Sequence, residues 1–305
     1  MAELNEPIVR QSASTGPNSP DVWGIYEPDT GSIQYICADP ATKKAALIDV
    51  VLNFDPARFA TDTRSMEQVL GLVEKHGLTV EWVLDTHPHA DHMMASSHLK
   101  KRTGAANAIG EKVRDIAELW RDYYNTPDAF DPHRDFDRLF ADGDTFRIGD
   151  LDVRVMLSPG HTLGSITYVC GDAAFVHDTL MMPDSGSSRA DFPGGSSADL
   201  YASIRRILAL PDDTRVYVGH DYAPEGRDAE CCATVAEHKA SNIHFRDDPT
   251  EAEYRATRDA RDATLPLPKL MLAALQINTR GGRKPAPESD GRSYLKIPLD
   301  YFEPR

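Results

Sequence analysis

The feature that most constrains the fold is a run of metal-ligand residues at 86–92, which reads Thr-His-Pro-His-Ala-Asp-His. Residues 79–85 before it have the composition of a strand, so we predict a strand that ends where the run begins. Neutral imidazole and carboxylate are ligands suited to Zn, Fe and Mn, and a turn after a strand directs ligands at this spacing into one cleft. The candidate ligands are His87, His89, Asp91 and His92. The run therefore predicts a metal site at a strand end.

Further ligand-type residues also follow predicted strands. They are His161 after 151–157, Asp178 after 173–177 and His220 after 214–219. A structural role is the better expectation for any single histidine. The whole set in this order favours a shared site, because loops after strands gather at one edge of a sheet sandwich.

The remaining pattern alternates short strands and helices in two blocks. Predicted strands cover 22–26, 33–37, 44–49, 146–148 and 165–170, and predicted helices cover 66–73, 90–102, 110–124, 200–210 and 229–241. Another helix starts with Asp248 as its cap and Glu251 at its third position. Two blocks of strands followed by helices indicate an α/β fold in which two sheets pack face to face with helices outside.

The chain of 305 residues is long enough for one large domain. Residues 1–20 are polar and rich in Ser, Asn and Pro, so we predict a disordered N-terminal segment. Residues 21–246 form the predicted main domain. Residues 247–305 are predicted to be a C-terminal extension packed on it, and the last forty of them, which contain several prolines, are predicted to be irregular.

The charge of the chain disfavours several classes of partner. The formal net charge is −15, so the average field repels nucleic acid and anionic membranes. The sequence has no membrane-spanning apolar stretch and no apolar core of a secretory signal, and its four cysteines do not form a disulfide framework. We therefore expect a cytoplasmic protein with no nucleic-acid or membrane partner.

In the order and context of these motifs the sequence resembles the metallo-β-lactamase superfamily. The resemblance lies in the run at 86–92, Ser-Pro-Gly-His-Thr at 158–162, Val-His-Asp-Thr at 176–179 and Val-Gly-His-Asp at 218–221. It implies an αββα sandwich of two mixed β-sheets flanked by helices, with the domain at 21–246. Two branches of the superfamily imply different sites.

Resemblance to glyoxalase II implies two Zn-type ions and thioester hydrolysis. One ion would be held by His87, His89 and His161, and a second by Asp91, His92 and His220, with Asp178 as the bridge. In that case Asp91 would be the general base.

Resemblance to the persulfide dioxygenases implies one Fe(II) per chain, held by His87, His161 and Asp178. The other candidates, His89, Asp91, His92 and His220, would surround the ligands and orient them. Such an enzyme oxidises glutathione persulfide, or a related low-molecular-weight persulfide, with O2 to sulfite and thiol.

The sequence favours the dioxygenase branch. The stretch between His161 and Asp178 is short, as in that branch, and Arg189, Asp191 and Phe192 match a segment of the family, so we expect these three to bind substrate. Residues 184–188 differ from the Gly-Cys-Gly that is usual in both branches. The C-terminal part, at 270–282 and 294–299, resembles a bacterial subgroup of persulfide dioxygenase-like proteins.

Two alternatives stay open beside the dioxygenase. One is the thioester hydrolase, which would act on a glutathione conjugate, and the other is a metal-binding protein without catalysis. Expected partners are the small-molecule persulfide and O2, and a homodimer is expected only from the general frequency of such assemblies.

Overall fold

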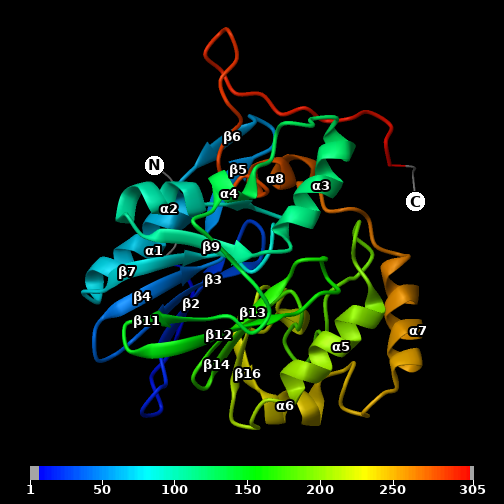
Figure 1. Cartoon of the computed structure of the whole chain (residues 1–305). Coiled ribbons are helices and arrows are strands. Elements are labelled where there is room, and N and C mark those ends of the chain that lie inside the picture. Colours follow the sequence, from blue (N-terminus) through cyan, green and yellow to red (C-terminus); the bar gives the residue numbers. More distant parts are fainter. Residues whose placement is uncertain (1–6, 303–305) are drawn as a thin grey trace.

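The structure of the chain is a computed structural model that describes residues 7–302, and two β-sheets form its centre (Figure 1). The first sheet has seven strands in the spatial order β1 (Val9–Ser12), β2 (Asp21–Glu27), β3 (Ser32–Ala38), β4 (Lys44–Ile48), β7 (Thr79–Leu84), β9 (Ala106–Gly110) and β10 (Arg138–Phe140). The second has six, in the order β11 (Thr145–Ile148), β12 (Leu151–Leu157), β13 (Ile166–Cys170), β14 (Ala173–His177), β15 (Arg215–Val218) and β16 (Cys232–Thr234). A small third sheet joins β6 (Ala60–Asp62), β5 (Val51–Asp55) and β8 (Met93–Met94).

Both large sheets are mixed. In the first, β1 to β4 pair antiparallel, whereas β4, β7, β9 and β10 run parallel. In the second, the parallel pair β14 and β15 interrupts antiparallel pairing. Their facing sides bury an apolar core in which the ring of Phe175 stacks on Tyr217 at 5.1 Å and meets Tyr35 edge-on at 5.4 Å. This packing holds the strand ends of the two sheets in fixed relative positions.

Helices cover the outer faces of the sandwich (Figure 1). They are α1 (Arg64–Lys75), α2 (Ser96–Thr103), α3 (Val113–Tyr124), α4 (Pro132–Asp135), α5 (Ser197–Leu208), α6 (Val235–Ser241), α7 (Glu251–Asp262) and α8 (Met271–Asn278), with a 3-10 turn, η1 (Pro224–Gly226). In α1 the buried Met66, Val69 and Val73 lie on one face, as the spacing predicts. The predicted architecture of two mixed sheets flanked by helices is confirmed. No helix of the described residues is long and apolar enough to cross a membrane.

The prediction of disorder over residues 1–20 is wrong for its described part. Val9–Ser12 forms β1 and pairs with β2, with Val9 opposite Ile25. Val9 also packs against a buried apolar cluster, and Arg10 forms an ion pair with Glu230 at 3.1 Å. Tertiary contacts therefore order a segment whose composition alone indicates disorder. Residues 1–6 lie outside the described residues.

Two predicted helices are wrong in their first parts. In the helix predicted over 90–102, Met93–Met94 instead forms β8, because Met94 pairs with Val51 and its N–H donates to Asn278 Oδ1 at 2.8 Å. In the helix predicted over 229–241, Cys232–Thr234 forms β16 at the edge of the second sheet.

The C-terminal extension contains the predicted helix, α7, and a second helix, α8, where irregular chain was expected. The predicted cap at Asp248 is wrong, since Thr250 caps α7 in a capping box with Glu253. Farther along, α8 places Ala273, Ala274 and Ile277 in the apolar cluster that also contains residues of α1. The extension thus contributes core residues, which its proline content did not indicate.

Candidate metal centre

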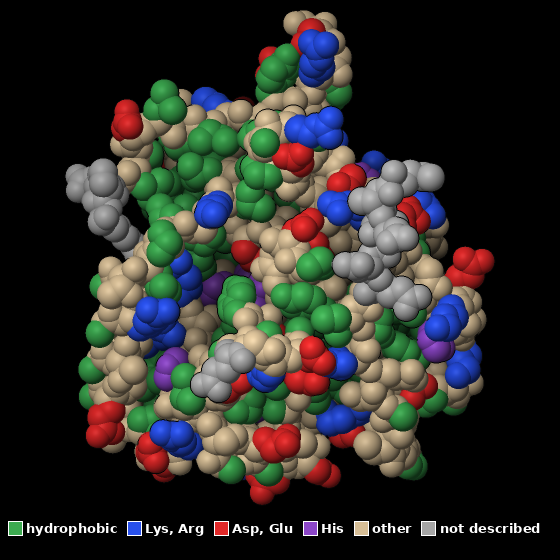
Figure 2. Space-filling model, turned by 180° about the vertical axis from the view of Figure 1, so that it is seen from behind, with side chains coloured by type: hydrophobic (Ala, Val, Ile, Leu, Met, Phe, Trp, Pro, Cys, Tyr) green, Lys and Arg blue, Asp and Glu red, His purple; other side chains and the backbone are tan. Residues whose placement is uncertain are grey.

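The loops that follow four strands meet at one edge of the sandwich. The run at 86–92 lies between β7 and β8, His161 follows β12, Asp178 follows β14 and His220 follows β15. Because β14 and β15 run parallel, Asp178 and His220 leave the second sheet side by side. The first sheet joins them there, since Ser32 forms a bridge with His220. On the face shown in Figure 2, histidine side chains are recessed among hydrophobic and basic side chains.

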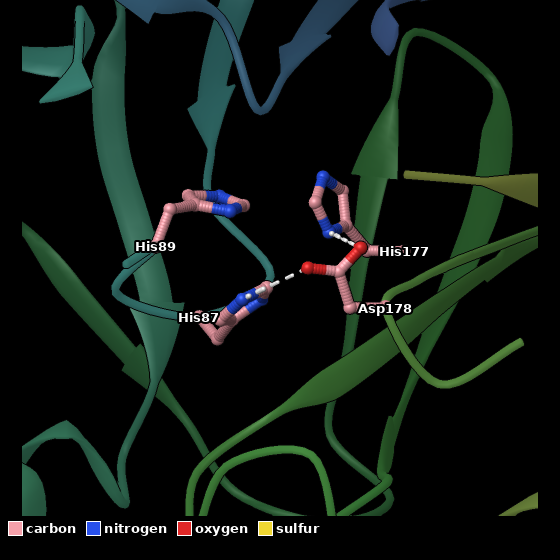
Figure 3. A group of neighbouring side chains, drawn as sticks. All are labelled: His87, His89, His177 and Asp178. Carbon is pink, nitrogen blue, oxygen red and sulfur yellow. Dashed lines mark ion pairs between the residues drawn. The ribbon is translucent and has the colours of Figure 1, made fainter. Parts of the chain in front are cut away.

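Asp178 lies at the centre of the group. Its Oδ2 is 3.6 Å from His87 Nε2 and 3.5 Å from His161 Nε2. Figure 3 shows the carboxylate directed toward His87. Ligand atoms that share one ion at about 2.1 Å lie roughly 3–3.5 Å apart, so these three atoms are close to the spacing of a common ion. The structure thus brings together the three residues expected to hold iron.

The second carboxylate oxygen faces the other candidates. Asp178 Oδ1 is 3.5 Å from His220 Nε2, which is 3.3 Å from Asp91 Oδ2. Asp91 Oδ2 is also 2.9 Å from His92 Nδ1. The Asp91 side chain is 27% exposed, so this side of the group is open to solvent. His89 also belongs to the cluster, with its ring stacked 4.1 Å from that of His92.

The donor atoms fit a metal ion. Several buried polar atoms of the cluster have no hydrogen-bond partner among the described residues, namely His87 Nε2, His89 Nδ1, His92 Nε2, His177 Nδ1 and Nε2, Asp178 Oδ1 and His220 Nδ1. Unpaired buried polar atoms are costly, and a cation that accepts their lone pairs would remove that cost. The histidines and the carboxylate of this cluster therefore fit a bound metal ion.

The electrostatics support the same conclusion. Burial lowers the pKa of His87 and His89 well below the usual range, so both rings are neutral, as ligands must be. Burial raises the pKa of Asp178, but His177 and His220 outweigh it and hold the pKa well below its usual range. Burial lowers the pKa of His220, yet Asp178 and Asp91 raise it to about 10. The carboxylates thus create a site that attracts cations.

Asp49, which the sequence analysis missed, orients the histidines of the run. It directly follows β4, and its Oδ1 accepts the Thr86 N–H at 2.8 Å and lies 3.0 Å from His89 Nε2. Its Oδ2 accepts the Thr86 hydroxyl at 3.0 Å, and that hydroxyl oxygen can then accept Nδ1–H of His87 at 3.1 Å. These contacts leave His87 Nε2 and His89 Nδ1 free for a ligand. A carboxylate at the last residue of a predicted strand, 44–49, was the available signal.

The loop before α5 supports His161. The Arg189 carbonyl accepts Nδ1–H of His161 at 2.9 Å, which leaves Nε2 unprotonated toward Asp178. Arg189 Nε and Nη2 donate to Asp191 at 2.7 and 2.9 Å, and Nη1 donates to the Pro266 carbonyl at 2.7 Å. The ring of Phe192 meets His161 edge-on at 5.2 Å. These three residues therefore lie beside the centre, and their expected role in substrate binding stays a prediction.

His177 and Tyr222 are further neighbours that the sequence analysis did not assign. His177 ends β14, and its ring lies 4.5 Å from the ring of His89. Tyr222 stacks on His220 at 5.7 Å and is 66% exposed, so its ring flanks the centre on the solvent side. No sequence pattern identifies either residue, because the position of each side chain beside the centre depends on the local backbone geometry.

Comparisons with known proteins agree with this geometry. The profile of the "Metallo-beta-lactamase superfamily" matches residues 32–220. The chain is 54% identical over 296 residues to a "Beta-lactamase hydrolase-like protein" of Xylella fastidiosa, covering 97% of this chain and 68% of the relative. It is 40% identical to "Glyoxylase B2" of Dictyostelium discoideum, covering 93% and 97%. It is 29% identical to "Persulfide dioxygenase ETHE1, mitochondrial" of Homo sapiens, covering 65% and 67%.

A solved structure shows the same similarity in three dimensions. The crystal structure of ETHE1 from Myxococcus xanthus matches with a TM-score of 0.68 and 31% identity, covering 90% of this chain and all of that chain. The matched profile spans the whole ligand set from the run at 86–92 to His220. On its fold, its ligand cluster and these relatives, the chain belongs to the metallo-β-lactamase superfamily.

Proposed function

We propose that the protein is an Fe(II)-dependent persulfide dioxygenase that oxidises glutathione persulfide, or a related low-molecular-weight persulfide, with O2. The observation that carries the proposal is the position of Asp178 Oδ2, within 3.6 Å of both His87 Nε2 and His161 Nε2. Two imidazoles and one carboxylate with open positions are the recurring ligand set of non-haem iron oxygenases. Similarity to proteins named persulfide dioxygenase supports this choice.

The reaction is a four-electron oxidation of the persulfide. One persulfide, one O2 and one water give one thiol and one sulfurous acid, which ionises to sulfite, and the S–S bond breaks. Iron held by His87, His161 and Asp178 would supply open positions for the substrate sulfur and O2 and a redox-active centre between them, while the persulfide provides the four electrons that reduce O2.

The side chains of this protein prepare the ligand set. His87 and His161 present unprotonated Nε2 atoms, because their Nδ1–H groups donate to the Thr86 hydroxyl oxygen and the Arg189 carbonyl. Asp178 stays ionised and compensates the charge of the metal. In this proposal Phe192, which contacts His161, and Tyr222, which contacts His220, would pack against the substrate, and Arg189, paired with Asp191, would lie beside the thiol carrier. Binding of the carrier away from the metal aligns its outer sulfur.

A second function has its own supporting observation. His220 Nε2 is 3.5 Å from Asp178 Oδ1 and 3.3 Å from Asp91 Oδ2, and these three atoms could hold a second ion. Two ions would favour a thioester hydrolase of the glyoxalase II type, in which Asp91 could act as general base. The name of the Dictyostelium relative supports this alternative.

Oxygen uptake separates the two functions. The protein is depleted of metal and loaded with Fe(II) without air, and a matched sample is loaded with Zn(II). Addition of glutathione persulfide should cause O2 consumption and release of an equal amount of sulfite only in the iron sample. Absence of uptake in a sample with verified iron, together with hydrolysis of S-lactoylglutathione by the zinc sample, would replace the dioxygenase with the hydrolase.

A further inference from the structure

His177 occupies a strained position that a structural role does not explain. It is the last residue of β14 and has φ of +40°, a left-handed conformation that costs a non-glycine residue about 1–2 kcal/mol. The pairing of β14 with β15 is irregular between Phe175 and His177. The side chain is 2% exposed. Strain of this kind persists where the surrounding structure enforces it, and it concentrates at functional sites.

The bulge directs the ring of His177 into the metal centre (Figure 3). Its ring centroid lies 4.5 Å from that of His89 and 5.1 Å from that of His87. Its Nδ1 is 3.1 Å from Asp178 Oδ1, a separation typical of two ligands on one ion. The ligand atoms of His87, His89, His177 and Asp178 all lie within 4.8 Å of one another. His177 thus lies among the candidate ligand atoms, beside Asp178 Oδ1.

Asp49 orients His177 in the same way as His89. Asp49 Oδ1 is 3.0 Å from His89 Nε2, and Asp49 Oδ2 is 3.5 Å from His177 Nε2. In both rings this arrangement turns Nδ1 toward the centre. Histidine ligands of metals typically have a carboxylate at the other ring nitrogen, which fixes the tautomer and the ring direction.

The alternative is a histidine held between two carboxylates for structural reasons. Neither nitrogen of His177 forms an aligned hydrogen bond to any described residue, although both are buried. The site also reserves space for the ring, because a Cβ on Gly219 would lie 2.4 Å from His177 Nδ1. A strained and confined imidazole whose two nitrogens face carboxylates without an aligned hydrogen bond favours a ligand over a structural ion pair.

We propose that His177 is a further ligand, through Nδ1, of the ion that Asp178 holds. The inference rests on the metal centre of the proposed function and adds a fourth protein ligand to His87, His161 and Asp178. An iron ion with six positions would then keep two, enough for one sulfur and one O2. Neither the sequence motif nor the resemblance assigns a ligand to this position.

Two substitutions test the proposal with little disturbance of the backbone. His177→Asn keeps a polar side chain of a residue type that tolerates positive φ, and His177→Gly relieves the strain. His238→Gln is the matched control, because His238 is also fully buried but lies on α6, outside the cluster. Far-ultraviolet circular dichroism and thermal unfolding of the metal-free proteins identify any variant that fails to fold.

The readout is metal binding rather than turnover. Each metal-free protein is titrated with Co(II) in competition with a chromophoric chelator, and the visible Co(II) spectrum is recorded at saturation. Loss of a ligand should weaken binding at least about 100-fold, the upper end of what removal of an outer partner costs. It should also change the saturated spectrum, while His238→Gln stays within about threefold of the parent.

Three results would overturn the proposal. They are unchanged affinity in both His177 variants, weaker affinity with an unchanged saturated spectrum, or binding of an additional Co(II) once the ring is removed. Failure of the dioxygenase proposal is read separately, from absent O2 uptake by the iron-loaded parent protein.

Discussion

Replacement of Asp49 by Asn should loosen the metal centre without replacing a proposed ligand of the iron. Asp49 is 1% exposed, and its two oxygens face three donors, the Thr86 N–H, the Thr86 hydroxyl and His89 Nε2, at 2.8–3.0 Å. An Asn side chain has one acceptor oxygen, so its NH2 group must face at least one of these donors.

The expected magnitude follows from these contacts. A hydrogen bond to a charged acceptor contributes about 1.5–3 kcal/mol, so Asp49→Asn should lower the free energy of unfolding of the metal-free protein by about 2 kcal/mol. The rings of His87 and His89 lose their fixed direction at the same time. Metal affinity should therefore fall about 10- to 100-fold, as for other outer partners of metal ligands.

Asp85 provides the matched control. It is fully buried nearby, and its Oδ2 accepts the Ser96 hydroxyl. Burial, reinforced by Asp49, raises the pKa of Asp85 well above its usual range, which favours the neutral form of this carboxyl. Asn mimics a neutral carboxyl, and Asp85→Asn should change the unfolding free energy by less than about 1 kcal/mol.

Urea unfolding of the metal-free proteins and chelator competition for Fe(II) or Co(II) measure both effects. A loss of unfolding free energy in Asp85→Asn as large as in Asp49→Asn would refute the claim that the contacts of Asp49 make the larger contribution. Parent-like metal affinity in Asp49→Asn would refute its orienting role.

Three further predictions concern separate parts of the molecule. Asp178→Ala should abolish tight iron binding and O2 uptake together, whereas Asp91→Ala should retain iron. Loss of iron in both variants would contradict the set of three ligands, His87, His161 and Asp178. Burial lowers the pKa of His238 to about 4. The contribution of the neutral His238 ring to the free energy of unfolding is therefore complete above pH 6.5 and is lost as the pH falls toward 4. This loss is about 2 kcal/mol at pH 5, and urea unfolding of His238→Gln should show a flatter pH dependence than the parent; an equal slope would contradict the burial argument. Gly219→Ala would place a Cβ 2.4 Å from His177 Nδ1 and 2.6 Å from Asp178 Oδ1. Metal affinity, measured by chelator competition, should therefore fall about tenfold or more. Unchanged affinity would contradict the close packing of Gly219 against these two side chains.

The sequence predicts most of the site because its signals are local. The ligand-type residues directly follow strand-forming segments, or a short turn after one. This holds for the run at 86–92 and for His161, Asp178 and His220. Strand ends and ligand chemistry are both visible in a single stretch of chain. The two mixed sheets follow from the same local signals.

The rest depends on contacts between distant segments. Asp49 joins the site because β4 runs parallel to β7, with Ile48 opposite Leu84, and no local pattern reveals that pairing. The direction of the His177 ring is set by a bulge and a left-handed backbone, whereas strand alternation alone gives no reason to expect it. Likewise, β1 exists because β2 and a buried cluster hold it.

The most direct test of the central claim is a crystal structure of the Fe(II)-loaded protein with anomalous diffraction measured at the iron absorption edge. The account predicts one iron peak per chain, within ligand distance of His87 Nε2, His161 Nε2 and Asp178. Two peaks of similar height, with the second between Asp91 and His220, would contradict the one-iron centre and support the binuclear hydrolase.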